Sequence, residues 1–263
     1  MAGRRLKAHI PLGLVLAAGF LCSVLSGCRN HPDRASAVAA SRAQNANPMP
    51  PAMAEQGRLI FDETPKYAHN YVGNKLSCGD CHLKSGTAAY SAPMVDMAGL
   101  FPMYNKRAGH IISLENRIQE CFARSEAGEP LPEDSLEMRS LVAYIDWLSR
   151  DGVKGKAYKG RGLVKLPTLR GDPVAGKTVY AAQCAACHGA DGAGAPPILP
   201  ALWGNDSYND GAGMNDPNKM APFVLYNMPQ NHPGTLTPQR AFDVAAYIHT
   251  RPRPKFNQAY KHY

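Results

Sequence analysis

Two short motifs of the form Cys-x-x-Cys-His hold the residues best suited to chemistry in this sequence of 263 residues. The first occupies residues 78–82 (CGDCH) and the second residues 184–188 (CAACH). Two thiols three positions apart can form thioethers with the vinyl groups at one edge of a porphyrin, and the adjacent histidine can then bind the iron. The motif therefore indicates a covalently attached c-type haem. The expected thioether residues are Cys78, Cys81, Cys184 and Cys187, and the expected proximal ligands are His82 and His188.

A redox dithiol or half of a zinc site could show the same cysteine spacing. About 100 residues separate the two motifs, whereas the ligand pairs of a zinc site usually lie ~15–20 residues apart. Each motif also carries a histidine directly after its second cysteine. We therefore expect two covalently bound haems and no four-thiolate zinc site.

The segments around the two motifs repeat as well. Residues 57–61 (GRLIF) precede the first motif and residues 176–180 (GKTVY) precede the second, and each segment reads as an opening helix. Tyr144 lies 62 residues after the histidine of the first motif, and Tyr247 lies 59 residues after that of the second. These matched distances indicate two domains of one kind.

A closing helix is expected at the end of each copy. Apolar residues recur at helical spacing over residues 135–149, where Asp134 or Ser135 is the expected N-cap. The same spacing recurs after Thr237, which is the expected cap of the second helix, with Pro238 in its first position.

The repeats resemble class I cytochrome c, which implies an all-α fold of two tandem domains that each wrap one haem. The expected divisions of the chain are a signal peptide (1–27), a lipidated N-terminus with a flexible spacer (28–54), an N-terminal haem domain (55–153), a linker (154–173), a C-terminal haem domain (174–251) and a tail (252–263).

The N-terminus reads as an export signal. Basic residues at 4–7 precede an apolar run over 10–25, and residues 25–28 (LSGC) resemble a bacterial lipobox. Cleavage before Cys28 would leave that cysteine as an acylated N-terminus. We therefore expect a periplasmic protein with a lipid tether to a bacterial membrane; an ordinary secretion signal and an uncleaved anchor helix are the alternatives. No later segment approaches the ~18 apolar residues that span a bilayer.

The charge balance argues against a nucleic-acid partner. The formal net charge is +8 at pH 7, and removal of residues 1–27 takes away three basic residues and no acidic one, which leaves +5. The basic residues are dispersed instead of forming blocks. A small anion or a protein partner remains compatible with this charge.

Each haem iron needs a sixth ligand, and Met228 is the expected one for the second haem. It is followed by proline, as in the distal-ligand loop that it resembles in class I cytochromes. Thioether ligation raises the reduction potential, which suits a site where electrons leave. Met214, Met220 and His232 are the other candidates, and core packing is the ordinary role of any one methionine.

A backbone carbonyl is expected to orient each proximal histidine. We expect that of Pro197 or Pro200 at His188, and that of Pro93 at His82.

Cys121 is the one cysteine of the mature chain outside both motifs and the predicted lipid anchor. A helix is expected from Ser113 to Ser125, and its apolar stripe turns Cys121 inward. Arg117, Cys121 and Ser125 are four residues apart and form one row. The residues alone fit two interpretations: a functional thiol beside a cation, or a small buried thiol with Arg117 reaching water or a haem propionate.

Residues 116–132 resemble the signature of dihaem thiosulfate dehydrogenases that form tetrathionate, as do residues 81–83 and 101–107. This resemblance implies that haem one is the active site, ligated by His82 and Cys121, and that haem two is ligated by His188 and Met228. It also implies a substrate pocket lined by Arg107, Arg117 and Ser125.

The resemblance implies an enzyme that oxidises two thiosulfate ions to tetrathionate and passes the electrons to a periplasmic cytochrome c or another acceptor. Arginines would offset the repulsion between two dianions. As a hypothesis, Cys121 forms a sulfur adduct with the first thiosulfate, which the second attacks. A non-catalytic dihaem electron carrier, the haem subunit of a multienzyme thiosulfate-oxidising complex, and a tetrathionate reductase are the alternatives.

Overall fold

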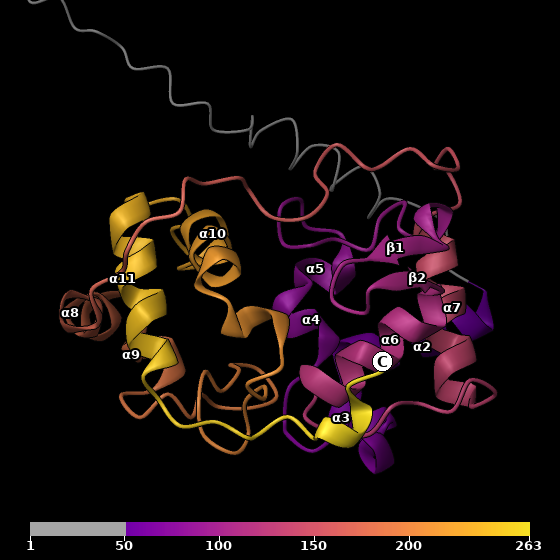
Figure 1. Ribbon diagram of the computed structural model, residues 1–263, viewed down its shortest axis with the longest axis horizontal. Coiled ribbons are helices and arrows are strands. Elements are labelled where there is room, and N and C mark those ends of the chain that lie inside the picture. The colour runs from indigo at the N-terminus through magenta and orange to yellow at the C-terminus, as the bar shows by residue number, and fades with distance from the viewer. Residues whose placement is uncertain (1–50) are drawn as a thin grey trace, which may run out of the picture. The chain divides into compact units, whose positions relative to one another are not determined.

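Helices dominate the computed structural model of the protein, which describes residues 51–263 (Figure 1). The elements of the first half are α2 (Ala52–Asp62), α3 (Thr64–Tyr67), η1 (His69–Tyr71), α4 (Cys78–Cys81), α5 (Leu83–Gly86), η2 (Ala98–Leu100), β1 (Met103–Asn105), β2 (His110–Ile112), α6 (Leu114–Arg124) and α7 (Leu136–Leu148). Those of the second half are α8 (Pro173–Gln183), α9 (Ala185–His188), η3 (Gly213–Asn215), α10 (Pro217–Asn227), α11 (Pro238–His249) and η4 (Gln258–Tyr260).

The predicted signal peptide, the lipidated Cys28 and most of the predicted spacer lie outside the described residues. The last three residues of that spacer, 52–54, form the first turn of α2. No helix within residues 51–263 is long and apolar enough to cross a bilayer.

Capping side chains fix where three of the helices begin. Ser113, Ser135 and Thr237 stand at the N-caps of α6, α7 and α11, and each side-chain oxygen accepts a hydrogen bond from the backbone N–H three residues later. The predicted starts of these helices are confirmed, with Ser135 as the cap of α7 in place of Asp134.

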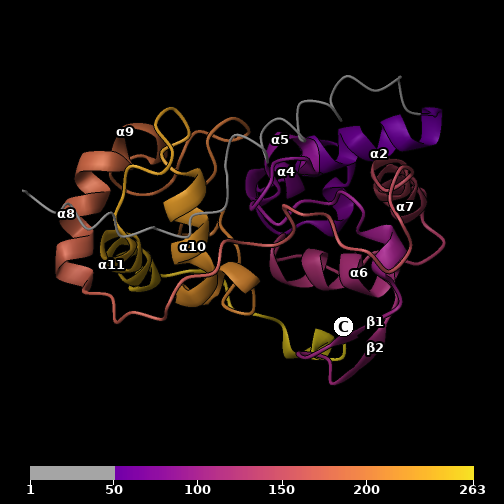
Figure 2. The same ribbon diagram turned by 90° about the horizontal axis from the view of Figure 1, so that it is seen from above.

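Two helix pairs repeat one mode of packing, α2 with α7 and α8 with α11 (Figures 1 and 2). In each pair a glycine lets two backbones meet. A Cβ at Gly57 would collide with the carbonyl oxygen of Ser140, and a Cβ at Gly176 would collide with that of Asp243. The glycine that opens each sequence repeat therefore allows the opening and the closing helix to approach each other closely.

An aromatic pair lies beside each of these contacts. The ring centroids of Phe61 and Tyr144 are 5.6 Å apart, and those of Tyr180 and Tyr247 are 5.4 Å apart. All four side chains are buried. The predicted equivalence of the two tyrosines is confirmed, because each takes the same place in its own half.

Each half has its own hydrophobic core, and a few residues join the two halves. Leu76, from the first half, packs into the core of the second. The side-chain amide of Asn74 donates to the carbonyls of Ser125 (2.8 Å) and Ser207 (3.1 Å), one from each half. All described residues fall within a single compact unit of the chain.

The predicted helical fold is confirmed, and the structure adds one small sheet. Strands β1 and β2 form an antiparallel hairpin in which Met103 pairs with Ile112 and Asn105 with His110. Its turn carries Arg107. A strand of three residues is too short to be predicted from the alternation of apolar and polar residues, which must repeat several times to be recognised.

Replacing either packing glycine by alanine is expected to destabilise the protein by about 1–3 kcal/mol, because the added methyl group has no space against the backbone of the facing helix. Gly57→Ala and Gly176→Ala should each lower the midpoint of denaturant unfolding of the haem-loaded protein. Gly99→Ala is the control, since its Cβ would meet nothing closer than the Cα of Lys154 at 3.5 Å. Equal midpoints for all three variants would contradict the packing argument.

Candidate haem-centred active site

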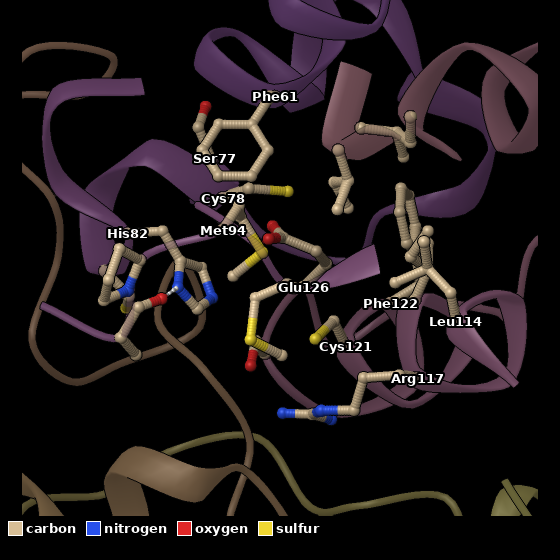
Figure 3. Close-up of a pocket in the computed structure, with 18 of the residues that line it drawn as sticks. Phe61, Ser77, Cys78, His82, Met94, Leu114, Arg117, Cys121, Phe122 and Glu126 are labelled. Carbon is tan, nitrogen blue, oxygen red and sulfur yellow. Dashed lines mark hydrogen bonds between the residues drawn. The ribbon is translucent and has the colours of Figure 1, made fainter. Parts of the chain in front are cut away.

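A cavity of about 230 Å³ in the first half brings together Cys78, Cys81, His82 and Cys121 (Figure 3). Figure 3 shows His82 on one side of the cavity and Cys121 with Arg117 on the other. Its walls are mainly apolar, with Phe61, Met94, Leu114, Ile118, Phe122 and Leu141 among them. Two thiols, an imidazole and an apolar enclosure are the donor set and surroundings that a c-type haem needs, so the residues present fit this group.

The first motif is held by its own short helix, α4. Asp80 stands at the third position of this helix and accepts a hydrogen bond from the N–H of Ser77 (2.8 Å), which closes a capping box. The N–H of Cys78 donates to the hydroxyl of Thr64 (3.1 Å). Burial raises the pKa of Asp80 to about 6. Asp80, one of the two residues between the cysteines, therefore helps to hold the short helix that carries both thiols.

The imidazole of His82 is oriented by the carbonyl of Ala92, which lies 2.6 Å from Nδ1. A carbonyl can only accept, so Nδ1 carries the proton and Nε2 is left with a free lone pair, as an iron ligand requires. Burial lowers the pKa of His82 to about 4 and keeps the ring neutral. The prediction that Pro93 supplies this carbonyl is wrong by one residue. A proline restricts the backbone of the residue before it, here Ala92, and the carbonyl of Ala92 is the one that faces His82.

A backbone carbonyl also orients the histidine of the second motif. Nδ1 of His188 lies 3.0 Å from the carbonyl of Pro200, which confirms one of the two predicted partners. Met228, at the C-cap of α10, and Cys184 are partly buried and pack against the same hydrophobic core. Cys187 is exposed, so the second motif lies closer to solvent than the first.

Two of the other candidates for the second sixth ligand share this core, because Met220 is part of it and Met214 packs against it. Met214 lines the cavity of the first half, and its carbonyl accepts from Nε2 of His249 at 2.9 Å. Met220 is buried in the core of the second half, and His232 is exposed.

Helix α6 supplies the wall opposite His82. Arg117, Cys121 and Ser125, predicted to share one row of this helix, all line the cavity. Burial raises the pKa of the Cys121 thiol, while the positive charges of Arg117 and Arg107 act in the opposite direction.

Arg107 is placed differently from the other predicted site residues. It is exposed in the hairpin turn and does not belong to the residues that line the cavity. Its N–H donates to Oδ1 of Asn105 at 2.8 Å, which fixes the turn.

Two charged residues that line the cavity were not predicted from the sequence. Glu126 is 2% exposed, its Oε2 has no hydrogen-bond partner, and burial raises the pKa of its carboxyl well above the usual range. It directly follows Ser125, so the signature run around Cys121 was the signal for it. Arg161 also lines the cavity, although it lies in the segment predicted as a linker.

That linker is paired with the residues that orient His82. The N–H of Tyr90 donates to the carbonyl of Gly160 (2.7 Å), and the N–H of Ala92 donates to that of Gly162 (2.8 Å). The segment therefore connects the two halves and also supports the proximal wall of the cavity.

The five cysteines of residues 51–263 form no disulfide bond. Within the same residues, no group of three or more His, Cys, Asp or Glu side chains comes together as a metal site.

Two family models match the chain. Residues 66–153 match the cytochrome c domain of the SoxA/TsdA family, and residues 173–252 match cytochrome c. Two cytochrome c domains imply c-type haems.

Known proteins resemble the chain over most of its length. It is 41% identical over 209 residues to the thiosulfate dehydrogenase of Stutzerimonas stutzeri, covering 77% of this chain and 68% of that protein. It is 40% identical over 214 residues to that of Allochromatium vinosum, covering 77% of this chain and 79% of that protein.

A solved structure, the thiosulfate dehydrogenase TsdBA of Marichromatium purpuratum in its as-isolated form, matches with a TM-score of 0.77 and 34% identity. The match covers 81% of this chain and 49% of that one, so the chain spans about half the length of this structural relative.

Removing both thiols of one motif should leave one haem per chain. The variants Cys78→Ala/Cys81→Ala and Cys184→Ala/Cys187→Ala are expected to keep the haem of the intact motif, because the two motifs lie in separate cores. Mass spectrometry of the denatured protein, together with a haem assay, measures the ratio. Two covalent haems in either variant would contradict the assignment.

Proposed function

The chain belongs to the SoxA/TsdA family of dihaem thiosulfate dehydrogenases, and we propose that it oxidises two thiosulfate ions to tetrathionate and passes two electrons on to an acceptor. The observation that carries this proposal is the cavity of the first half, where a thiol, an arginine and a hydroxyl face the proximal histidine. The same site could run in reverse as a tetrathionate reductase, since the direction depends on the acceptor.

His82 and Cys121 are the proposed ligands of the first haem, and His188 and Met228 those of the second. Each haem, when bound, supplies a one-electron centre, with thiolate ligation favouring a lower and thioether ligation a higher potential. Support for the first pair comes from the cavity that both residues line. For the second pair, Met228, Met214 and Cys184 all pack against one core, and Met228 is proposed because a proline follows it, as in the distal-ligand loop of class I cytochromes that it resembles.

Arg117 and Arg107 are proposed to bind the anions. Thiosulfate is a dianion, and two of them must approach each other before their sulfurs can join. A guanidinium offers several N–H donors to oxyanions and offsets this repulsion. The hydroxyl of Ser125, one turn beyond Cys121, adds a hydrogen-bond donor in the same cavity.

Cys121, which would leave the iron for this step, is proposed as the sulfur nucleophile. Its thiolate bonds to the terminal sulfur of the first thiosulfate, and two electrons leave to the acceptor as the new S–S bond forms. The second thiosulfate then attacks that terminal sulfur, releasing tetrathionate and restoring the thiolate. Positive charge from Arg117 favours the thiolate in both steps.

Electrons are proposed to leave from the second half toward a periplasmic cytochrome c or another acceptor. Cys187 is exposed there, and Ile198, in the loop before Pro200, is 83% exposed. A cofactor edge close to the surface shortens the distance to a partner.

A pure electron carrier and a haem subunit of a multienzyme complex remain the competing functions. Neither function requires an arginine and a hydroxyl on the same face of the helix as the cysteine that would bind the iron. Here Arg117, Cys121 and Ser125 all line one cavity. We also propose that the protein is periplasmic and tethered to a membrane by lipid on Cys28, on the strength of the LSGC sequence alone.

The variant Cys121→Met tests the catalytic proposal. Methionine can still ligate iron, so both haems should load, whereas tetrathionate formation from thiosulfate with ferricyanide as acceptor should fall by at least a hundredfold because no nucleophilic thiol remains. Cys121→Ser should be equally inactive. Full turnover by either variant would remove Cys121 from the chemistry, and an inactive native protein with both haems loaded would favour the carrier.

The variant Cys28→Ser tests the lipid tether. The native protein is expected to partition into the detergent phase of a Triton X-114 extract, and the variant to remain in the aqueous phase, because serine cannot be acylated through a thioether. Equal partitioning of the two would contradict the tether without affecting the enzymatic proposal.

A further inference from the structure

We propose that Glu120 is a positioning residue for anion binding, whose buried carboxylate holds Arg117 and, through Asn105, the hairpin turn that carries Arg107. The inference rests on the proposed function, because it is there that both arginines are assigned to thiosulfate. It concerns how this chain connects the two elements that carry these arginines, α6 and the hairpin.

A single carboxylate oxygen joins two elements of the fold. Oε2 of Glu120 accepts from Nη1 of Arg117 at 2.9 Å, within α6, and from Nδ2 of Asn105 at 2.8 Å, on β1. Figures 1 and 2 show the hairpin beside α6. The same oxygen of Glu120 therefore connects the hairpin to α6 and restrains Arg117.

Asn105 extends the connection into the turn. Its Oδ1 accepts from the N–H of Arg107 (2.8 Å) and from that of Ala108 (3.2 Å). An asparagine that bonds the backbone two residues later is a common device for fixing a turn. A continuous set of hydrogen bonds thus runs from the guanidinium of Arg117 to the backbone of Arg107.

The pair differs from an ordinary surface ion pair between residues three apart, which contributes little. The side chain of Glu120 is 2% exposed, whereas that of Arg117 is 42% exposed. The other oxygen of Glu120, Oε1, is buried without a partner. A buried carboxylate with so few partners depends strongly on the cation it has, so Arg117 is kept beside it.

This arrangement leaves Arg117 able to serve an anion. A guanidinium has five N–H donors, and the ion pair with Glu120 uses Nη1. Restraining the side chain of Arg117 and the backbone of Arg107 before substrate arrives lowers the entropic cost of ordering them during binding.

The first test measures anion binding. In Glu120→Ala, the Kd for sulfate, an unreactive dianion followed by calorimetry on the haem-loaded protein, and the KM for thiosulfate should each rise about tenfold, the effect of losing one charge-assisted hydrogen bond. The value of kcat should change less. Glu120→Gln keeps an acceptor oxygen for both donors and should stay within about threefold of the native protein.

Glu115→Ala is the matched control, because Glu115 lies on the same helix and makes no hydrogen bond or ion pair to the hairpin in the described residues. It should leave both constants unchanged. An equal rise in Glu115→Ala and Glu120→Ala would overturn the specific role of Glu120.

The second test measures the hairpin itself by hydrogen exchange and does not depend on thiosulfate. Amides of residues 103–112 should exchange about tenfold faster in Glu120→Ala and at least as fast in Asn105→Ala, which also loses its own bonds to the turn. The double variant should be no faster than Asn105→Ala alone, because the contact with Glu120 is already lost there. Unchanged exchange in Glu120→Ala would overturn the tie between helix and hairpin.

Failure of the inference and failure of the proposed function give different results. Faster exchange with an unchanged sulfate Kd would overturn the anion-positioning role and leave a structural one. A native protein whose affinity for sulfate depends on Glu120 but that does not oxidise thiosulfate would overturn the proposed function while supporting the inference.

Discussion

The close approach of an opening and a closing helix, allowed by one glycine in each half, is the constraint on which the rest of the fold depends. Gly57 lies against the backbone of Ser140, and Gly176 against that of Asp243. In the first half, the segments around this contact enclose the cavity that the first motif and Cys121 line. The same helix contact in each half gives two domains with one architecture. Their proposed functions differ because different residues lie inside each domain.

The first half places a neutral histidine and a helix of functional side chains on opposite sides of one cavity. The carbonyl of Ala92 sets the tautomer of His82, and the segment that connects the two halves pairs with Tyr90 and Ala92. On the opposite wall, the four-residue spacing of α6 presents Arg117, Cys121 and Ser125 together. Charge at Arg117 counteracts the effect of burial on the Cys121 thiol. The proposed reaction, an encounter of two dianions at a thiol, follows from this grouping.

Much of this arrangement could be predicted from the sequence, because the signals were local. The two motifs, the caps at Ser113 and Thr237 and the inward row of α6 are patterns within a few residues of each other, and the structure reproduces all of them. The parts that could not be predicted depend on contacts between distant segments. Glu126 and Arg161 line the cavity, and Glu120 reaches the hairpin, through tertiary packing that no spacing encodes. The carbonyl at His82 was misplaced by one residue for a local reason, because the residue before Pro93 presents its carbonyl to the histidine.

The central claim is that thiosulfate gives its electrons to this protein at the cavity of the first half. The most direct measurement is anaerobic addition of thiosulfate to the oxidised, haem-loaded chain, with the Soret and α bands followed and tetrathionate assayed. The account predicts haem reduction with one tetrathionate formed for every two electrons accepted. Haems that remain oxidised with thiosulfate, yet are fully reduced by dithionite, would contradict it.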